Sequence, residues 1–382
     1  MRTYDVAIIG GGIIGVSIAF ELAAEQLRVI VLDRQEPGRE ASWAAAGMLS
    51  PAPDSPRDLP LVPFARESLR LYPQFVQAIE EASGKPAAYV REGALEIFVS
   101  ANAERECEDR LRELQLLGIT AEAIPAEEAR RAEGSINLSA RAALQLPEEG
   151  TVEPRVLMGA LIAAARNRGV ELRAGCEVSG LLRDGERRVG VIAGGERIVS
   201  RHVILAAGSF SGEIAGEPWL KQFAPTRPVR GQMLALRPNA RAAGPQRVIR
   251  SEDGYLVPRG DGRVVVGSTI EEAGFEKQVT AAGLSKLLSA AIEMCPDLGG
   301  AEVVETWAGL RPGTPDDLPV LGSCDIDGLW VATGHYRNGI LLAAATARLF
   351  REMILGTRQS FDANRFSPMR FGCREMRART AV

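Results

Sequence analysis

The stretch Tyr4-Asp-Val-Ala-Ile-Ile-Gly10-Gly-Gly12-Ile-Ile-Gly15 decides the fold of a large part of this chain. It opens as a run typical of a buried parallel strand, then places three glycines at GxGxxG spacing before apolar residues continue at helical spacing to Leu22. The first glycine permits a tight turn, the second lets backbone approach a pyrophosphate, and the third lets the helix pack on the strand. The pattern therefore predicts a strand, a phosphate-binding turn and a helix.

A second apolar run, Val29 to Leu32, ends in Asp33, which lies 18 residues after Gly15. Doubly wound folds place the acid that accepts ribose hydroxyls about 20 residues after the glycine turn. Arg34 follows, and an acid at this place fits an adenosine without a 2′-phosphate. A GxGxxG alone is weak evidence, but strand, helix, second strand and acid all agree here. Both NAD and FAD stay open at this point.

The composition excludes several classes of protein. The chain has 382 residues with 46% hydrophobic and 25% charged residues, which is typical of a globular protein of about two domains. A net charge of -4 gives no sign of a nucleic-acid partner. Its five cysteines form no CxxC pair, so we expect no metal site and a reducing, cytoplasmic location. The uncharged run from Val6 to Phe20 is too short for a membrane span.

Further segments narrow the choice of cofactor. These are the small-residue run REASWAAAGMLSP at 39–51, VILAAGSFSG at 203–212, TWAGLRPGTPDDLPVLG at 306–322 and GHYRNGILLAAATA at 334–347. With the first 33 residues they resemble, in the same order, the D-amino acid oxidase family of FAD-dependent oxidoreductases. Within it they look most like the glycine oxidases of the thiamine-biosynthetic type. The resemblance extends to about residue 366 and implies non-covalently bound FAD, since 306–323 holds no cysteine.

The family fold implied is α/β (α+β): an FAD-binding, doubly wound Rossmann-like domain interleaved with a substrate domain on a mixed, largely antiparallel sheet. Strand-like runs at 94–99, 232–236, 254–258 and 263–266 lack long helices between them, as an antiparallel sheet requires. A helix is expected at 154–168 and a hairpin with its turn at Asp184-Gly185. We expect the FAD-binding domain at 1–85, 145–220 and 305–366, the substrate domain at 86–144 and 221–304, and a frayed basic tail at 367–382.

The cofactor residues that the resemblance implies share small side chains or a place at a strand or helix end, where backbone amides reach phosphate and ring edges. The helix after 334–341 would direct its positive end at the flavin pyrimidine edge. His335 is as much a structural as a catalytic candidate, and His202 is expected to be structural. The implied set is Gly10, Gly12, Ile13, Ile14, Gly15, Asp33, Arg34, Ala41, Ser42, Ala46, Gly47, Met48, Val178, Ala207, Gly208, His335, Tyr336, Arg337, Asn338, Gly339, Ile340 and Leu341.

The resemblance also implies a substrate site. Arg311 would hold an amino acid carboxylate bidentately, Tyr255 would meet the same carboxylate, and Arg337 would lie close by. Met48 and Ile270 would limit the substrate to glycine, sarcosine or small D-amino acids. The implied reaction is hydride transfer from the amine carbon to flavin N5, which gives an imine, then a 2-oxo acid and ammonia or amine, with hydrogen peroxide formed from molecular oxygen.

Other interpretations stay open. One is a flavin dehydrogenase of the same fold that passes electrons to an acceptor other than oxygen. Another is a non-catalytic nucleotide-binding module, against which the presence of Arg311, Tyr255 and Arg337 argues. The family relatives are commonly homotetramers, so a homo-oligomer is expected. The role implied by the glycine oxidase resemblance is supply of the glycine imine for thiamine thiazole synthesis.

Overall fold

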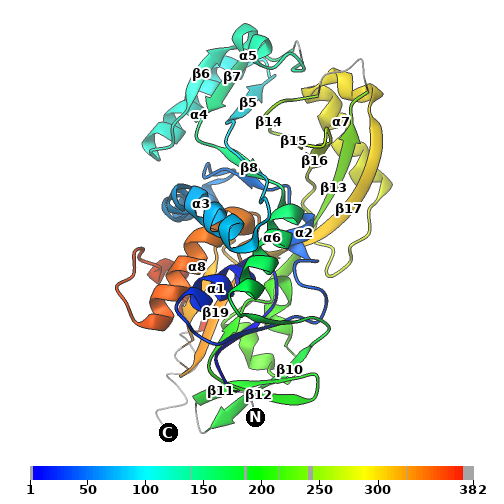
Figure 1. Cartoon of the computed structure of the whole chain (residues 1–382). Coiled ribbons are helices and arrows are strands. Elements are labelled where there is room, and N and C mark those ends of the chain that lie inside the picture. The colour runs from blue at the N-terminus through cyan, green and yellow to red at the C-terminus, as the bar shows by residue number, and fades with distance from the viewer. Residues whose placement is uncertain are drawn as a thin grey trace.

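Two sheets, one above the other in Figure 1, organise the chain and are joined by several crossings of the backbone. The structure is a computed structural model and describes residues 3–372 apart from 138, 185–186, 215, 240–243 and 325. The expected fold class, with a doubly wound sheet and a mixed second sheet, is confirmed. Among the described residues, no helix combines the length and the apolar character that crossing a bilayer requires.

The lower sheet has eight strands around a parallel core. β1 pairs in parallel with β2 on one side and with β12 on the other, β2 with β9, and β12 with β19. An antiparallel hairpin extends the early part of β12, and β18 pairs antiparallel with β19. The strands are β1 (Thr3–Ile9), β2 (Val29–Leu32), β9 (Glu171–Arg173), β10 (Val178–Asp184), β11 (Arg187–Ala193), β12 (Glu196–Leu205), β18 (Val320–Ser323) and β19 (Leu329–Thr333). The expected hairpin turn at Gly185 lies outside the described residues.

Alternation along β1 explains why both faces of this sheet are covered. Val6 and Ile8 pack into a core with four helices, whereas Ala7 and Ile9 pack on the opposite face. The four helices are α1 (Ile13–Ala24), α3 (Val62–Ser83), α6 (Pro154–Asn167) and α8 (Gly339–Leu355), seen at the centre of Figure 1. Side chains of the β10–β11 hairpin and of η3 (Pro218–Gln222) pack on the opposite face. A further 3-10 segment, η2 (Gly208–Glu213), contacts η3 and β19.

The upper sheet has the strand order β17-β13-β16-β15-β14-β5-β7-β6 and is antiparallel except where β14 pairs with β5. Its strands are β5 (Ala94–Phe98), β6 (Glu122–Pro125), β7 (Ala142–Leu146), β13 (Arg227–Arg237), β14 (Val248–Ser251), β15 (Gly254–Pro258), β16 (Val264–Gly267) and β17 (Glu302–Gly313). Three helices pack on it: α4 (Ala103–Leu116), α5 (Ala126–Ala132) and α7 (Ala281–Met294). The four runs expected to be strands, at 94–99, 232–236, 254–258 and 263–266, correspond to β5, β13, β15 and β16 of this one sheet.

Short elements connect the two sheets. β3 (Met48–Leu49), β4 (Tyr89–Val90) and β8 (Gly150–Val152) form a small sheet of their own in the order β3-β8-β4. α2 (Ala41–Ala44) packs on β17 and α6. The remaining short helices are η1 (Pro56–Leu61), η4 (Pro296–Gly300), η5 (Asn364–Phe366) and α9 (Met369–Gly372).

Two boundaries differ from the expectation. β17 begins at Glu302 and pairs with β13 along its whole length, so the segment to Gly313 belongs to the upper sheet rather than to the domain expected from 305. The reason is an antiparallel ladder with one register shift, between Ala235 and Leu236, and the sequence of a single strand does not reveal such pairing. The tail expected to fray from residue 367 instead begins packed, because Arg370 forms an ion pair with Asp316 and donates to the Phe366 and Ser367 carbonyls. Residues 373–382 lie outside the described part.

Gly15 offers a test of why the third glycine of the turn is required. A Cβ built there would lie 2.0 Å from the Gly10 carbonyl oxygen, which is backbone and cannot move aside cheaply. We expect Gly15→Ala to destabilise the protein by about 1 to 3 kcal/mol, as overpacking does. Gly159→Ala is the matched control, because Gly159 is also helical and its Cβ would meet nothing within 4 Å. Urea unfolding followed by circular dichroism measures both, and equal stabilities would contradict the packing argument.

Candidate active site

A single elongated cavity of about 980 Å³ runs from the glycine turn to the edge of the upper sheet. Gly10 and Asp33 line it beside the lower sheet, Arg311 lines it beside the upper sheet, and Ala46 and Met48 belong to the segment that connects the two sheets. Its size is at the upper limit of ordinary small-molecule sites, and its length joins both sheets. The ligand it fits is therefore long and contacts both halves of the chain.

The glycine-turn end has the features of an anion and ribose site. Helix α1 begins after Gly12, and the Ile13 amide donates to the Ser42 hydroxyl at 2.9 Å. The Asp33 carboxylate accepts from the amides of Gly11, at 2.7 Å, and Gln35, at 2.8 Å. Burial raises the pKa of Asp33, and these two amides oppose the rise. The first amides of α1 and an oriented carboxylate thus meet at one end of the cavity.

A second helix N-terminus meets the middle of the cavity. Helix α8 begins at Gly339, and Asn338 before it makes no side-chain cap hydrogen bond. Asn338, Gly339 and Ile340 all line the cavity, so the first amides of this helix are available to a ligand. Two helix ends in one cavity favour a ligand with negative charge at two separate places.

His335 is buried in the turn before α8. Its Nε2 lies 3.1 Å from the Thr346 hydroxyl, and burial lowers its pKa to about 3. The imidazole is therefore neutral at ordinary pH. Because His335 is paired with Thr346 inside the fold, a structural role is favoured over the catalytic role that the sequence had also left open.

The segment from Ala44 to Met48 is held against the cavity by the upper sheet. Arg259, at the end of β15, donates to the Ala46 carbonyl at 2.6 Å and to the Val152 carbonyl at 3.3 Å, and pairs with Glu153. Gly47 has a φ of +77°, and a Cβ there would lie 2.0 Å from the Val152 carbonyl oxygen. Gly47 therefore has no room for a side chain, because it packs against the backbone at the end of β8.

Arg311 extends from β17 into the far end of the cavity. Its guanidinium donates to the Ser268 hydroxyl at 2.7 Å and to the carbonyls of Thr269, at 3.1 Å, and Arg230, at 3.3 Å. Burial lowers its pKa, an effect that Tyr255 and Tyr336 nearby oppose. In the described part of the chain, no carboxylate forms an ion pair with it. A desolvated cation with neutral partners has a strong preference for an anionic ligand.

Two glycines let the groups at this end approach. A Cβ at Gly231 would lie 2.3 Å from the Arg311 guanidinium, and a Cβ at Gly267 would lie 2.4 Å from the Tyr255 hydroxyl. The guanidinium therefore lies over the backbone of β13 and the phenol over the backbone of β16. Tyr255 and Arg311 come from strands that are not neighbours in the sheet, yet both line the same end of the cavity.

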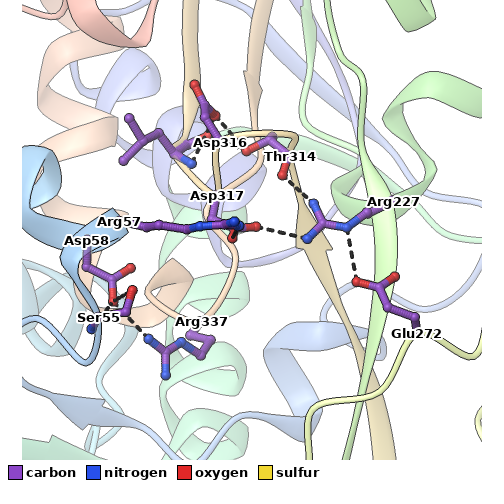
Figure 2. Close-up of polar contacts among 10 residues, drawn as sticks. Ser55, Arg57, Asp58, Arg227, Glu272, Thr314, Asp316, Asp317 and Arg337 are labelled. Atoms are coloured by element: carbon purple, nitrogen blue, oxygen red, sulfur yellow. Dashed lines mark hydrogen bonds and ion pairs between the residues drawn. The ribbon is translucent and has the colours of Figure 1, made fainter.

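Arg337 differs from Arg311, although both line the cavity. Its guanidinium pairs with Asp54 at 2.6 Å and Asp58 at 3.0 Å, and Figure 2 shows it pointing to Asp58 beside Ser55. Burial alone would lower its pKa, but the two carboxylates outweigh burial and raise it. Its charge is already balanced within the protein.

The structure brings most of the predicted site residues together. Gly15 and Leu341 do not line the cavity: Gly15 packs on the Gly10 carbonyl, and Leu341 is buried in the core beneath α8. Arg34 lines it, but its guanidinium lies 3.7 Å above the Phe210 ring and near Glu40. The other predicted residues that line the cavity are Gly10, Gly12, Ile13, Ile14, Asp33, Ala41, Ser42, Ala46, Gly47, Met48, Val178, Ala207, Gly208, Tyr255, Ile270, Arg311, His335, Tyr336, Arg337, Asn338, Gly339 and Ile340.

Several supporting residues were missed by sequence reasoning. Gly231, Gly267, Ser268 and Arg259 shape or hold the groups described above, but none belongs to a recognisable short motif. The available signal was weak: Gly267 ends the apolar run 264–266, and Arg259 follows the strand that carries Tyr255. Their roles depend on partners outside their own strand or turn, such as Tyr255 for Gly267 and Arg311 for Gly231.

This two-sheet fold and a cavity that receives the N-termini of two helices are typical of a protein that binds a dinucleotide. The family model of the FAD dependent oxidoreductases, DAO, matches residues 5–353. The glycine oxidase of Pseudomonas aeruginosa is 34% identical over 95% of this chain and 98% of its own. The crystal structure of glycine oxidase from Geobacillus kaustophilus superposes with a TM-score of 0.90 at 31% identity, covering 97% of this chain and 99% of that chain. The bifunctional protein ThiO/ThiG of Synechocystis is 35% identical over 97% of this chain, which spans 54% of that protein.

The chain belongs to the DAO family of FAD-dependent oxidoreductases, and its cofactor is FAD. The cavity fits this group: it receives the N-termini of two helices, α1 and α8, at separate places, and Gly47 lines it without a side chain. Gly12, Ser42 and the first turn of α1 would hold the pyrophosphate, and Asn338 to Ile340 would meet the flavin ring.

Because His335 is neutral in the folded protein, we expect the free energy of unfolding to decrease at acidic pH. The unfolded chain binds a proton here below pH about 6.5, whereas the folded chain does so only near pH 3, so stability is lost as the pH falls between these values. At pH 5.0 the loss from this group reaches about 2 kcal/mol. Unfolding of wild type and His335→Gln at pH 7.5 and 5.0 measures it; an equal pH dependence in both would contradict it.

A substitution at Gly231 tests whether Arg311 can bind a carboxylate only when residue 231 has no side chain. In Gly231→Ala the new methyl group would displace the guanidinium, so we expect a small carboxylate such as glycolate to bind at least about tenfold more weakly. The change in flavin absorption on titration measures the affinity. Gly299→Ala is the control, because its Cβ would make only ordinary contacts of 3.8 Å with Ile292. Unchanged affinity in Gly231→Ala would show that the guanidinium moves aside without loss.

Proposed function

We propose that this protein oxidises glycine and other small amines, such as sarcosine and small D-amino acids, to a 2-oxo acid, ammonia or amine, and hydrogen peroxide. The observation that carries the proposal is the state of Arg311. Five arginines line the cavity, and in the described part of the chain four of them pair with a carboxylate while Arg311 does not. The four are Arg34, Arg110, Arg250 and Arg337.

The protein residues bind and orient the substrate. Arg311 would take the substrate carboxylate through the N–H groups that do not donate to Ser268, Thr269 and Arg230, and the Tyr255 hydroxyl would add a second contact. Bidentate binding fixes the direction of the amine carbon as well as the affinity. FAD supplies the two-electron oxidation of the carbon–nitrogen bond when it is bound.

No general base is required of the protein in this proposal. The neutral His335 is committed to Thr346 and lies buried, and the groups that Arg311 contacts are the Ser268 hydroxyl and the carbonyls of Thr269 and Arg230. The first amides of α8 would stabilise negative charge that develops on the ring system they face. The protein thus contributes binding, orientation and electrostatics.

The residues around Arg311 and Tyr255 would limit the size of the substrate. Met48 in β3 and Ile270 after β16 line the cavity, and they would restrict the space for a side chain on the amine carbon. The names of the relatives support a small substrate: several are glycine oxidases, and others are bifunctional ThiO/ThiG proteins. We therefore propose that the imine of glycine, supplied for thiamine thiazole synthesis, is the product that matters.

The absorption spectrum of the FAD-loaded protein tests the proposed function. Anaerobic addition of glycine should bleach the flavin absorption, and readmitted air should restore it with one equivalent of hydrogen peroxide. Bleaching without peroxide would instead support a dehydrogenase that uses another acceptor. No bleaching with glycine, sarcosine or D-alanine would contradict oxidation of small amines.

Removal of the Arg311 guanidinium tests the proposed binding of the substrate carboxylate directly. Arg311→Ala should keep FAD but lower kcat/KM for glycine by at least about a hundredfold, because a hydrogen bond to a charged group contributes about 1.5 to 3 kcal/mol and orientation adds to it. Arg105→Ala is the control, since that side chain is 86% exposed on α4. Unchanged kinetics in Arg311→Ala would refute the proposal that Arg311 binds the substrate carboxylate.

A further inference from the structure

Residues 44–47, which we call the linking segment, belong to the chain that connects the two sheets, and they line the cavity. Two of their carbonyls accept hydrogen bonds from the upper sheet. The Trp307 indole, in β17, donates to the Ala44 carbonyl at 3.0 Å. Arg259, which follows β15, donates to the Ala46 carbonyl at 2.6 Å. The linking segment is thus attached to the upper sheet through its carbonyl groups.

The amides of the linking segment are used differently. In the part of the chain that the structure describes, the amides of Ala45, Ala46 and Gly47 have no hydrogen-bond acceptor. Ala46 and Gly47 are buried. Buried amides are nearly always paired in folded proteins, so unpaired amides beside a cavity indicate a ligand that brings the acceptors. FAD is such a ligand, because its ring system carries carbonyl oxygens and ring nitrogens.

Peptide geometry fixes the direction of two of these amides. A trans peptide is planar, and its N–H points opposite to its C=O. The Ala46 carbonyl points to Arg259, so the Gly47 amide points away from Arg259. By the same reasoning, the Ala45 amide points away from Trp307. Both amides belong to residues that line the cavity, so the donors of the upper sheet leave them available to the cofactor.

The chain leads to the linking segment from the place where the pyrophosphate would bind. Ser42, two residues before the segment, accepts from the Ile13 amide at the start of α1. After the segment, Met48 begins β3 and also lines the cavity. Gly47 is therefore farther along the cofactor than Ser42, and its amide would meet the flavin ring.

Arg259 is a costly choice of donor for the linking segment. Its side chain is only 5% exposed, and burial of a cation is unfavourable unless the charge has a partner. The partner is Glu153, whose carboxylate oxygen lies 2.9 Å from the Arg259 Nε. Trp307 attaches the same segment with a neutral donor. A charged donor adds a further effect: it polarises the peptide that accepts its hydrogen bond, and the N–H of that peptide becomes a stronger donor.

We propose that Arg259 is a positioning residue for FAD, which directs and polarises the Ala46–Gly47 peptide so that the Gly47 amide donates to the flavin ring and favours its reduced state. A stronger donor stabilises the negative charge that two-electron reduction adds to the ring. The proposal concerns the cofactor and not the substrate. It can therefore be tested whether or not glycine is oxidised.

The reduction potential of the bound FAD tests the proposal, measured by anaerobic reduction in the presence of a dye of known potential. In Arg259→Gln the preference for reduced over oxidised FAD should fall about tenfold, which lowers the potential by about 30 mV for a two-electron couple. Arg263→Gln is the matched control, because it removes a cation only four residues away that pairs with Asp261 and Glu305. It should change the preference less than about twofold. Equal decreases in both variants would overturn the proposal, since they would show an effect of charge alone.

A second variant tests the same idea with the opposite sign. Glu153→Gln removes the carboxylate that partly balances Arg259, so the peptide should be polarised more strongly and the potential should rise. This variant also decides the matter if Arg259→Gln yields no folded, FAD-loaded protein. A purely structural role would lower the affinity of Arg259→Gln for FAD, yet leave the potential of the FAD that stays bound at the wild-type value. That result, or a potential that does not rise in Glu153→Gln, would overturn the proposal.

Discussion

At Gly15, helix α1 crosses the turn before it so closely that the Cα lies against the Gly10 carbonyl, with no room for a methyl group. This approach sets the direction of α1, and with it the place where the first amides of the helix meet the cavity. Gly10 in turn lies against the backbone at Ala206, where β12 ends. Three backbone segments are thus fixed around one point, and the cavity begins there.

Glycines also permit close approach to the backbone beside the upper sheet, where Arg311 and Tyr255 lie. Gly231 and Gly267 remove side chains from two strands of the upper sheet, so that a guanidinium and a phenol lie flat on the backbone. The 40 glycines of the chain are therefore of more than one kind. Most serve turns, while a few permit close approach, and those few surround the cavity at both ends.

Charge is distributed unevenly over the arginines of the cavity. Arg250 pairs with Glu96 and Glu149, and Arg337 with Asp54 and Asp58, which ties segments of both sheets together. Arg311 is held by neutral oxygens alone among the described residues. Neutral partners orient a guanidinium without quenching its charge, so the ability to attract an anion is concentrated at one place.

Parts of this arrangement were predictable from sequence because they are local. The strand, glycine turn and helix at the N-terminus need only neighbouring residues, and so do the strands at 254–258 and 264–267. The place of β17 in the upper sheet was not predictable, since it depends on pairing with β13 across about 75 residues. The packing of Arg370 on Asp316 was missed for the same reason.

The sequence by itself determined the doubly wound element, its FAD-type glycine turn and the family, because motif order and spacing are properties of the chain. Through the family resemblance it also singled out Arg311 as the carboxylate-binding arginine and Arg337 as a second arginine close to the substrate. Only the tertiary structure decided that one is balanced by Asp54 and Asp58 while the other lies over Gly231 with neutral partners. The charge available to a ligand depends on which side chains meet in space, and residue type and spacing do not specify those meetings.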